Sequence, residues 1–379
     1  MPDTHHPQRN LDKYQDCESV TELSNEILSG TGNSVAILSL ALRGSAGVSR
    51  EVEQQAKELS ENGYEVTIFV LEADMESPDG VSLRVISGYD SFYLNKINHL
   101  FYPLNIPKVI RVVKELISYD LLIAHRYPLT CLSYYAAKIG SVPYVVWHYH
   151  TPELDEMPSL PQKLFVRSLA YFEEESWIVK NADIACSISD SSREILKKQS
   201  GVNSLVMAND TETKRFDNVE PDYTAVNEEY RLQEDDPIVL FVGRLTATKN
   251  VLEFIKVFED VRKGIPKAKL VIAGKPTVKE YFQELQDEAE SNVIFTKFVS
   301  DGELLALYKM ADVYATCSMR EGRNLPPGEA QEYGTEVVGF DVPGIRDIVD
   351  KGVLVEPGNY NQFSDAVIKI LLKQPEFNE

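Results

Sequence analysis

Two glutamates flank a turn whose residues suit the binding of an anion. Glu321 and Glu329 have seven residues between them, and Pro326 and Pro327 open a predicted helix within that interval. Proline favours the first turn of a helix, and the backbone N–H groups that enter a helix carry partial positive charge that binds phosphate. Because a carboxylate repels phosphate but accepts hydrogen bonds from hydroxyls, the spacing fits a nucleotide sugar. A solvated turn with two surface glutamates is the alternative.

Two basic residues follow another apolar segment. Arg244 comes just after the predicted strand 238–242, and Lys249 lies at the start of the next predicted helix. A cation at a helix N-terminus opposes the helix dipole at a cost of about 0.3–1 kcal/mol, and a bound anion reverses that sign. We interpret the pair as a diphosphate clamp, with a forked guanidinium and a point-charge ammonium. Two solvated basic side chains are the alternative.

Weaker signals stand in the first half of the chain. Gly44 and Gly47 follow the first predicted strand and allow the backbone to approach a phosphate, although an ordinary strand-to-helix turn explains them more simply. His148 and His150 close the predicted strand 144–149, and strand alternation puts them on one face. No cysteine or acid stands at ligand spacing beside them, so no metal site is predicted, and a structural histidine is the alternative role.

Composition narrows the class of protein. The 379 residues are 43% hydrophobic and carry a net charge of −21, and this charge argues against nucleic acid as a main partner. The four cysteines lie far apart and form no metal or redox spacing. No apolar run approaches the roughly 20 residues of a membrane span, and the N-terminus has no secretory signal, so we expect a cytoplasmic protein.

Apolar strands and amphipathic helices alternate in two separate runs. Near-continuous apolar strands between helices predict α/β domains, each a parallel sheet covered on both faces. The domains we expect are a mobile extension over 1–32, a Rossmann-like domain over 33–209, an acidic linker over 210–236 and a second Rossmann-like domain over 237–361. Ligands bind at the carboxyl ends of parallel strands, so the four charged candidates should converge on a cleft between the two domains.

One segment combines aromatic and basic residues. Residues 91–116 hold Lys96, Lys108, Arg111 and Lys114 against one acid, in a chain that is otherwise strongly acidic. This pattern allows peripheral contact with the inner face of a membrane or with a lipid-linked acceptor, although an ordinary half-buried pair of helices explains it more simply.

Together these stretches resemble the GT-B glycosyltransferases of family four, the group 1 type. The resemblance runs over most of residues 34–373 and is carried by FVGRLTATKN, EGRNLPPGEA, YGTEVVGFDVPG with VLVEPGN after it, and YVVWHYHTPE. It implies two Rossmann-like domains facing a cleft and retaining transfer of a sugar from a UDP- or GDP-linked donor. The acceptor would be a glycan, lipid-linked or small-molecule hydroxyl in glycan biosynthesis, and neither a cofactor nor a metal is implied.

The resemblance also assigns roles to residues. Arg244 and Lys249 hold the diphosphate, Glu329 binds the nucleotide ribose and Glu321 contacts the donor sugar. The backbone at Asn324 and Leu325 meets the phosphate or sugar, the Gly44–Gly47 loop faces it from the other domain, and His150 is the active-site histidine; a last helix over about 362–379 packs back on the first domain.

The turn departs from the family pattern. Arg323 and Asn324 replace the usual aromatic–Gly pair, and Glu336 replaces a usual Pro, which leaves the identity of the sugar open. Two other functions stay open on the same fold. One is a sugar-nucleotide epimerase or phosphorylase, and the other is a non-catalytic subunit that binds a nucleotide sugar through the altered turn.

Overall fold

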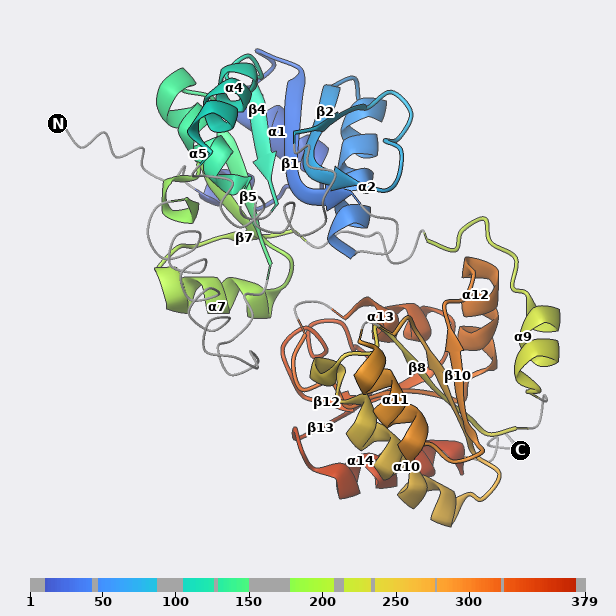
Figure 1. Cartoon of the computed structure of the whole chain (residues 1–379). Coiled ribbons are helices and arrows are strands. Elements are labelled where there is room, and N and C mark those ends of the chain that lie inside the picture. The colour runs from blue at the N-terminus through green and yellow to red at the C-terminus, as the bar shows by residue number, and fades with distance from the viewer. Residues whose placement is uncertain are drawn as a thin grey trace, which may run out of the picture. The chain divides into compact units, whose positions relative to one another are not determined.

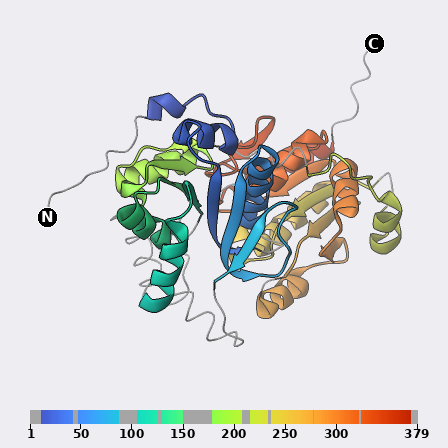
Figure 2. The ribbon, with the colours of Figure 1, turned by 90° about the horizontal axis from the view of Figure 1, so that it is seen from above.

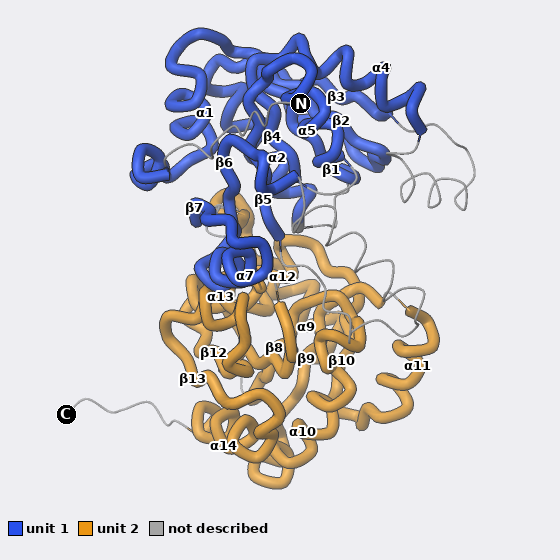
Figure 3. Tube along the Cα trace, turned by 90° about the vertical axis from the view of Figure 1, so that its left-hand side faces the viewer, with its two compact units in different colours: residues 1–209 blue, residues 210–379 orange. Residues whose placement is uncertain are grey.

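The chain folds into two compact units. The computed structural model describes residues 11–42, 47–86, 105–125, 129–149, 178–207, 215–232, 236–276, 278–321 and 324–372. The units are Met1–Asn209 and Asp210–Glu379, coloured blue and orange in Figure 3. Each contains one parallel sheet with helices on both faces, which confirms the predicted α/β class.

The first unit is built on a seven-stranded sheet with the strand order β3-β2-β1-β4-β5-β6-β7. Its strands are β1 Ser34–Leu42, β2 Glu65–Ala73, β3 Ser82–Val85, β4 Leu121–Ala124, β5 Tyr144–His148, β6 Ile184–Ser187 and β7 Leu205–Val206. Its helices are η1 Leu11–Tyr14, α1 Val20–Leu28, α2 Gly47–Glu61, α4 Ile106–Leu116, α5 Thr130–Gly140, η5 Val179–Asn181 and α7 Asp190–Ser200.

Alternate residues of each central strand enter different cores. Val35 and Ile37 of β1 pack with α1 and α2, while Ala36 and Leu38 pack with α4 and α5. Figures 1 and 2 show the blue helices α1 and α2 on one side of the sheet and the teal to green helices α4 and α5 on the other. Both faces of β1 are therefore apolar, as its sequence indicates.

The interpretation of residues 1–32 as a mobile extension is wrong for the part that the structure describes. Residues 11–28 contain η1 and α1, and five of their side chains are buried in the core that α2 also lines: Tyr14, Val20, Leu23, Ile27 and Leu28. The backbone N–H of Thr21 donates to Glu58 Oε1 of α2 at 3.0 Å. Residues 1–10 lie outside the described part of the chain.

The second unit is built on a six-stranded sheet with the order β10-β9-β8-β11-β12-β13. Its strands are β8 Ile238–Val242, β9 Lys269–Ala273, β10 Val293–Lys297, β11 Val313–Thr316, β12 Glu336–Phe340 and β13 Gly352–Val355. Its helices are α9 Tyr223–Tyr230, η6 Ala247–Lys249, α10 Val251–Gly264, α11 Lys279–Glu288, α12 Asp301–Met310, α13 Leu325–Glu332 and α14 Tyr360–Leu371. Helices α10, α11 and α14 cover one face, and α9, α12 and α13 cover the other.

The predicted acidic linker 210–236 is largely part of this second unit. Phe216, Val226 and Leu232 are buried in the core that α12 lines, and the Asp222 side chain caps α9. Helix α9 has a single buried position among acidic residues, so its sequence shows no amphipathic pattern. Residues 208–214 and 233–235 lie outside the described residues.

The described part of the last helix, α14, belongs to the second unit, where Phe363, Val367 and Ile370 are buried beside α10 and β12. The expected packing of 362–379 on the first domain stays a prediction. Residues 373–379 lie outside the described ranges. None of the helices within those ranges is long and apolar enough to cross a membrane.

Candidate functional site

The loop after β8 is anchored by its backbone and carries an exposed cation at its centre. Gly243 N–H donates to the Ala273 carbonyl at 2.9 Å, and Leu245 N–H donates to the Lys275 carbonyl at 3.2 Å. Arg244 lies between these two anchored residues with its side chain exposed. Its backbone position is therefore fixed while its guanidinium remains available to a ligand.

A glycine just after the neighbouring strand β9 makes this anchoring possible. A Cβ added to Gly274 would lie 1.7 Å from the carbonyl oxygen of Gly243, far inside any contact distance. We expect Gly274→Ala to force the two loops apart and to lower the free energy of unfolding by more than about 2 kcal/mol, as overpacking does. Urea unfolding measures this loss.

Gly358→Ala is the matched control for that change. Gly358 has φ +85° and no heavy atom within 4 Å of an added Cβ, so alanine there brings only backbone strain, on the order of 1 kcal/mol. If Gly274→Ala unfolds at the wild-type urea concentration, the two loops are not held in contact as described.

Lys249, Glu321 and Asn324 form a compact cluster. Lys249 Nζ lies 2.5 Å from Glu321 Oε1 and 3.5 Å from Asn324 Oδ1. The lysine and glutamate side chains are only 16% and 8% exposed. Lys249 ends the short turn η6 rather than opening α10, which begins at Val251. Two residues predicted to bind different parts of a ligand are thus paired with each other in this structure.

The turn into α13 offers fewer backbone donors than a typical helix start. Asn324 occupies the N-cap position, its side chain makes no capping hydrogen bond, and its backbone N–H donates to the Gly344 carbonyl at 3.1 Å. Pro326 and Pro327 have no N–H, so two of the backbone donors of a typical first helical turn are missing at this helix end. Side-chain cations must therefore supply more of the charge than the sequence analysis assumed.

Glu329 is the most enclosed of the predicted site residues that the structure describes. It is 2% exposed and accepts hydrogen bonds from Arg215 Nη1 at 3.0 Å and from the Tyr308 hydroxyl at 2.6 Å. Arg215 Nη2 also donates to Asp301 Oδ1 at 2.7 Å. Sequence reasoning missed Arg215 and Tyr308, because one lay in the supposed linker and the other looked like an ordinary helix core residue.

Both donors to Glu329 are held in their protonated forms. Burial raises the pKa of Tyr308 well above its usual value, and the nearby Glu329 carboxylate adds to the rise. Burial acts to lower the pKa of Arg215, but the Glu329 and Asp301 carboxylates outweigh it, and the net change is a rise. The carboxylate of Glu329 thus keeps one cationic and one neutral donor.

The predicted residues of the first unit are only partly described. Gly44 and His150 lie outside the described residues, and Gly47 begins α2. His148 ends β5 and is buried. No group of three or more His, Cys, Asp or Glu side chains is placed to hold a metal ion within the described part of either unit.

A buried chain of polar contacts lies at the carboxyl ends of β4 and β5. His125 Nδ1 is 2.7 Å from the Tyr149 hydroxyl, which donates to Glu51 Oε2 at 2.9 Å. Burial lowers the pKa of His125 to about 3, so this imidazole is neutral at physiological pH. A cavity of about 920 Å³ also lies in this unit, between η1, α7 and β7, and the described site residues do not line it.

Two units with parallel sheets and a cation–carboxylate cluster at the strand ends define the GT-B class of glycosyltransferase folds. Solved structures agree. Sucrose-phosphate synthase from Thermosynechococcus elongatus has a TM-score of 0.70 at 20% identity, covering 89% of this chain and 90% of its own. Anabaena HepE in complex with UDP and glucose has a TM-score of 0.68 at 15% identity, covering 90% of both chains. At such identities the likeness establishes the fold alone.

Sequence comparisons define the family. Glycosyl transferases group 1 matches residues 222–379, and Glycosyltransferase Family 4 matches residues 45–207. The chain belongs to the group 1 GT-B glycosyltransferases.

The match between this chain and its curated relatives covers a different share of each relative's length. An uncharacterized glycosyltransferase of Methanocaldococcus jannaschii, MJ1607, is 34% identical over 145 residues, 37% of each chain. Alpha-monoglucosyldiacylglycerol synthase of Streptococcus pneumoniae is 24% identical over 88% of this chain and 77% of its own length. EpsD of Bacillus subtilis is matched over 56% of its length, so the chain spans less than two thirds of two of these three relatives.

Proposed function

We propose that this glycosyltransferase transfers a sugar, with retention of configuration, from a nucleoside diphosphate donor to an acceptor hydroxyl. The observation that carries the proposal is the Lys249–Glu321–Asn324 cluster beside the anchored Arg244 loop. A diphosphate is bound by cations, and a sugar is bound by groups that accept hydrogen bonds from its hydroxyls. This edge of the second unit supplies both. Relatives solved with UDP and glucose, or with UDP-2-fluoro glucose, support a UDP-linked donor over a GDP-linked one.

The Lys249–Glu321 pair suggests how the site is prepared for its donor. Without a ligand, each charge of this half-buried pair neutralises the other. When the donor binds, Lys249 pairs with the diphosphate instead of Glu321, and Glu321 accepts hydrogen bonds from the sugar hydroxyls. Neither charge is then left without a partner. This exchange avoids the large cost of an unpaired buried charge.

In the proposed reaction the acceptor oxygen attacks the anomeric carbon from the face that the diphosphate leaves. The bond from the anomeric carbon to the phosphate oxygen breaks, the new glycosidic bond forms, and a departing phosphate oxygen takes the acceptor proton. Arg244 and Lys249 stabilise the charge that grows on the diphosphate, as fixed donors do in an oxyanion hole. Glu321 acts on the sugar hydroxyls rather than as a nucleophile, and His150 and the Gly44–Gly47 loop would contact the donor from the first unit.

The test begins with a thermal-shift screen of UDP- and GDP-linked sugars, because a ligand at 100 times its dissociation constant stabilises by about 2.7 kcal/mol. The stabilising donor is then incubated with glycan, lipid-linked and small-molecule acceptors, and NMR determines the anomeric configuration of the product. We expect transfer with retention, unchanged by EDTA because the arginine and lysine supply the charge. An inverted product overturns the proposed stereochemistry, and loss of transfer in EDTA overturns metal independence.

Two other outcomes would replace this proposal. Consumption of the donor without any acceptor points to an epimerase or phosphorylase. Tight donor binding without transfer to any acceptor in a cell extract points to a non-catalytic subunit.

We also propose that helices α4 and α5 place the protein on the inner face of a membrane, where a lipid-linked acceptor would be available. Ile106, Ile110 and Ile139 are 62%, 49% and 70% exposed on these helices. Arg111, Lys114 and Lys138 are exposed beside them. Exposed isoleucines with basic neighbours fit an anionic lipid surface. Residues 91–104 of the predicted segment lie outside the described residues.

Reversing these three charges should release the protein from anionic vesicles. Each basic residue near such a surface contributes about 1 kcal/mol, so the triple change to glutamate should weaken partitioning at least about 100-fold. Sedimentation with vesicles of phosphatidylserine and phosphatidylcholine measures it. The control reverses three exposed lysines of the second unit: Lys256, Lys263 and Lys267. Equal losses in both variants would show that overall charge, and not this surface, governs binding.

A further inference from the structure

We propose that Arg215 is a positioning residue for the donor, acting through Glu329 on the ribose of the nucleotide. This inference rests on the proposed function, in which Glu329 binds the ribose hydroxyls. Arg215 is 19% exposed at its side chain and Glu329 is 3% exposed, so the ion pair between them lies largely away from solvent. Removing the cation from a buried ion pair leaves the partner uncompensated at a large cost, so the arginine is needed to hold the glutamate side chain in place.

The geometry leaves Glu329 with capacity for a ligand. An ionised carboxylate accepts about four hydrogen bonds, two at each oxygen. Arg215 occupies one position on Oε1, and Tyr308 occupies one on Oε2. Counting the described residues alone, one acceptor position therefore remains on each oxygen, and two adjacent acceptors match the two neighbouring hydroxyls of a ribose. Two donors on different oxygens also prevent the carboxylate from rotating.

Arg215 is itself fixed by two further contacts. Its second terminal nitrogen donates to Asp301 at the first turn of α12, and its guanidinium carbon lies 4.8 Å from the centre of the Phe216 ring. The Ser300–Glu303 capping box holds that end of α12. The position of Glu329 thus depends on a chain of contacts that leads back to a capped helix end.

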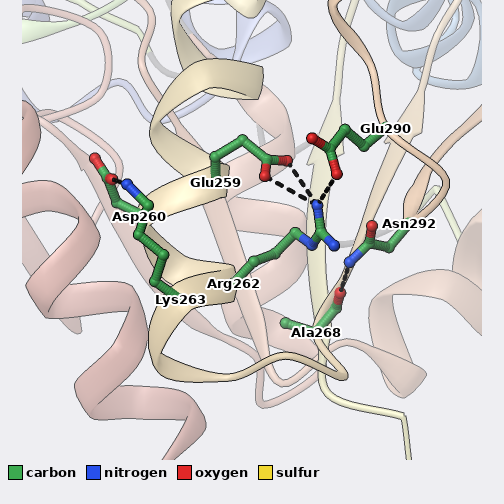
Figure 4. Close-up of polar contacts among 7 residues, drawn as sticks. All are labelled: Glu259, Asp260, Arg262, Lys263, Ala268, Glu290 and Asn292. Carbon is green, nitrogen blue, oxygen red and sulfur yellow. Dashed lines mark hydrogen bonds and ion pairs between the residues drawn. The ribbon is translucent and has the colours of Figure 1, made fainter.

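The same unit supplies a matched control. Arg262, 24% exposed, bridges Glu259 and Glu290, and its Nη1 lies 2.9 Å from Glu259 Oε2 (Figure 4). It stands in the last turn of α10, just before β9 begins, and hence at the amino edge of the sheet. The candidate site lies at the opposite, carboxyl edge. Arg262→Met therefore removes a similar charge and two similar ion pairs without touching the site.

The experiment compares ribose and 2′-deoxyribose forms of the donor that the thermal-shift screen selects. In the wild type we expect KM to favour the ribose form by roughly 10–100-fold, the value of a hydrogen bond to a charged group. Arg215→Met should raise KM for the ribose form by about that factor, change kcat little and leave less than about a threefold preference. Arg215→Lys should restore part of the preference, and Arg262→Met should retain all of it.

The outcomes separate this inference from the function that it rests on. If Arg215→Met transfers sugar with the wild-type ribose preference, Arg215 has no positioning role and the proposed function still stands. If the wild type binds and transfers no nucleotide sugar, both fall together. Should Arg215→Met not fold, Tyr308→Phe tests the same arrangement, since loss of the other donor should reduce the ribose preference at least threefold, and an unchanged preference would overturn the inference.

Discussion

Lys249→Met should lower kcat/KM for the sugar donor by about 10²–10³, because it removes a fixed cation from the developing charge of the leaving diphosphate. It should also destabilise the folded protein by about 3–5 kcal/mol, since Glu321, 8% exposed at its side chain, would be left without its partner. Steady-state kinetics with saturating acceptor and urea unfolding measure the two effects separately.

A second substitution separates stability from catalysis at this pair. Adding Glu321→Gln to Lys249→Met removes the uncompensated charge, so the double variant should regain most of the lost stability and none of the lost turnover. A Lys249→Met enzyme that turns over at the wild-type rate would show that the lysine does not meet the diphosphate.

Arg244→Ala should lower kcat/KM by a similar factor of about 10²–10³, roughly 3 kcal/mol, but with almost no effect on folding. Arg244 is exposed and makes no ion pair in the described part of the chain, so its removal should change the free energy of unfolding by less than about 0.5 kcal/mol. Kinetics together with urea unfolding check both halves of this expectation.

Arg244→Lys is the matching control, because it keeps the charge but loses the forked geometry that binds two phosphate oxygens at once. Its kcat/KM should lie between those of the wild type and the alanine variant. If Arg244→Ala keeps most of its turnover with the correct donor, the diphosphate clamp does not include this residue.

The convergence of Lys249 and Glu321 follows from topology that the sequence already indicates. The two residues are 72 positions apart, yet β8 and β11, which lead to them, are hydrogen-bonded neighbours in the sheet. Apolar runs separated by helices predict a parallel sheet, and all its strands end at one edge. What sequence reasoning did not predict is that the two side chains pair with each other, because it treated each as reserved for a ligand.

The contact between Arg215 and Glu329 could not be predicted from the sequence. It spans 114 positions, and Arg215 stands in a stretch whose acids suggested a solvated linker. Only one residue of α9, Val226, is fully buried, so no periodic apolar pattern marked the helix. The N-terminal segment was misjudged for a different reason. Six of the nine residues of α1 are buried, and Val20, Leu23 and Ile27 stand at helical spacing, but the polar residues among them were taken as the mark of a mobile extension. A helix such as α9, with one buried position, carries too few apolar residues to be recognised in the sequence.

Binding of the donor diphosphate at the cation cluster is tested most directly by isothermal titration calorimetry of the selected nucleotide sugar, its nucleoside diphosphate and the bare nucleoside. The wild type should bind the first two, Lys249→Met and Arg244→Ala should bind them at least about tenfold more weakly, and the bare nucleoside should not distinguish the three proteins. Equal affinity of all three proteins for the nucleoside diphosphate would contradict the assignment of these residues to the diphosphate.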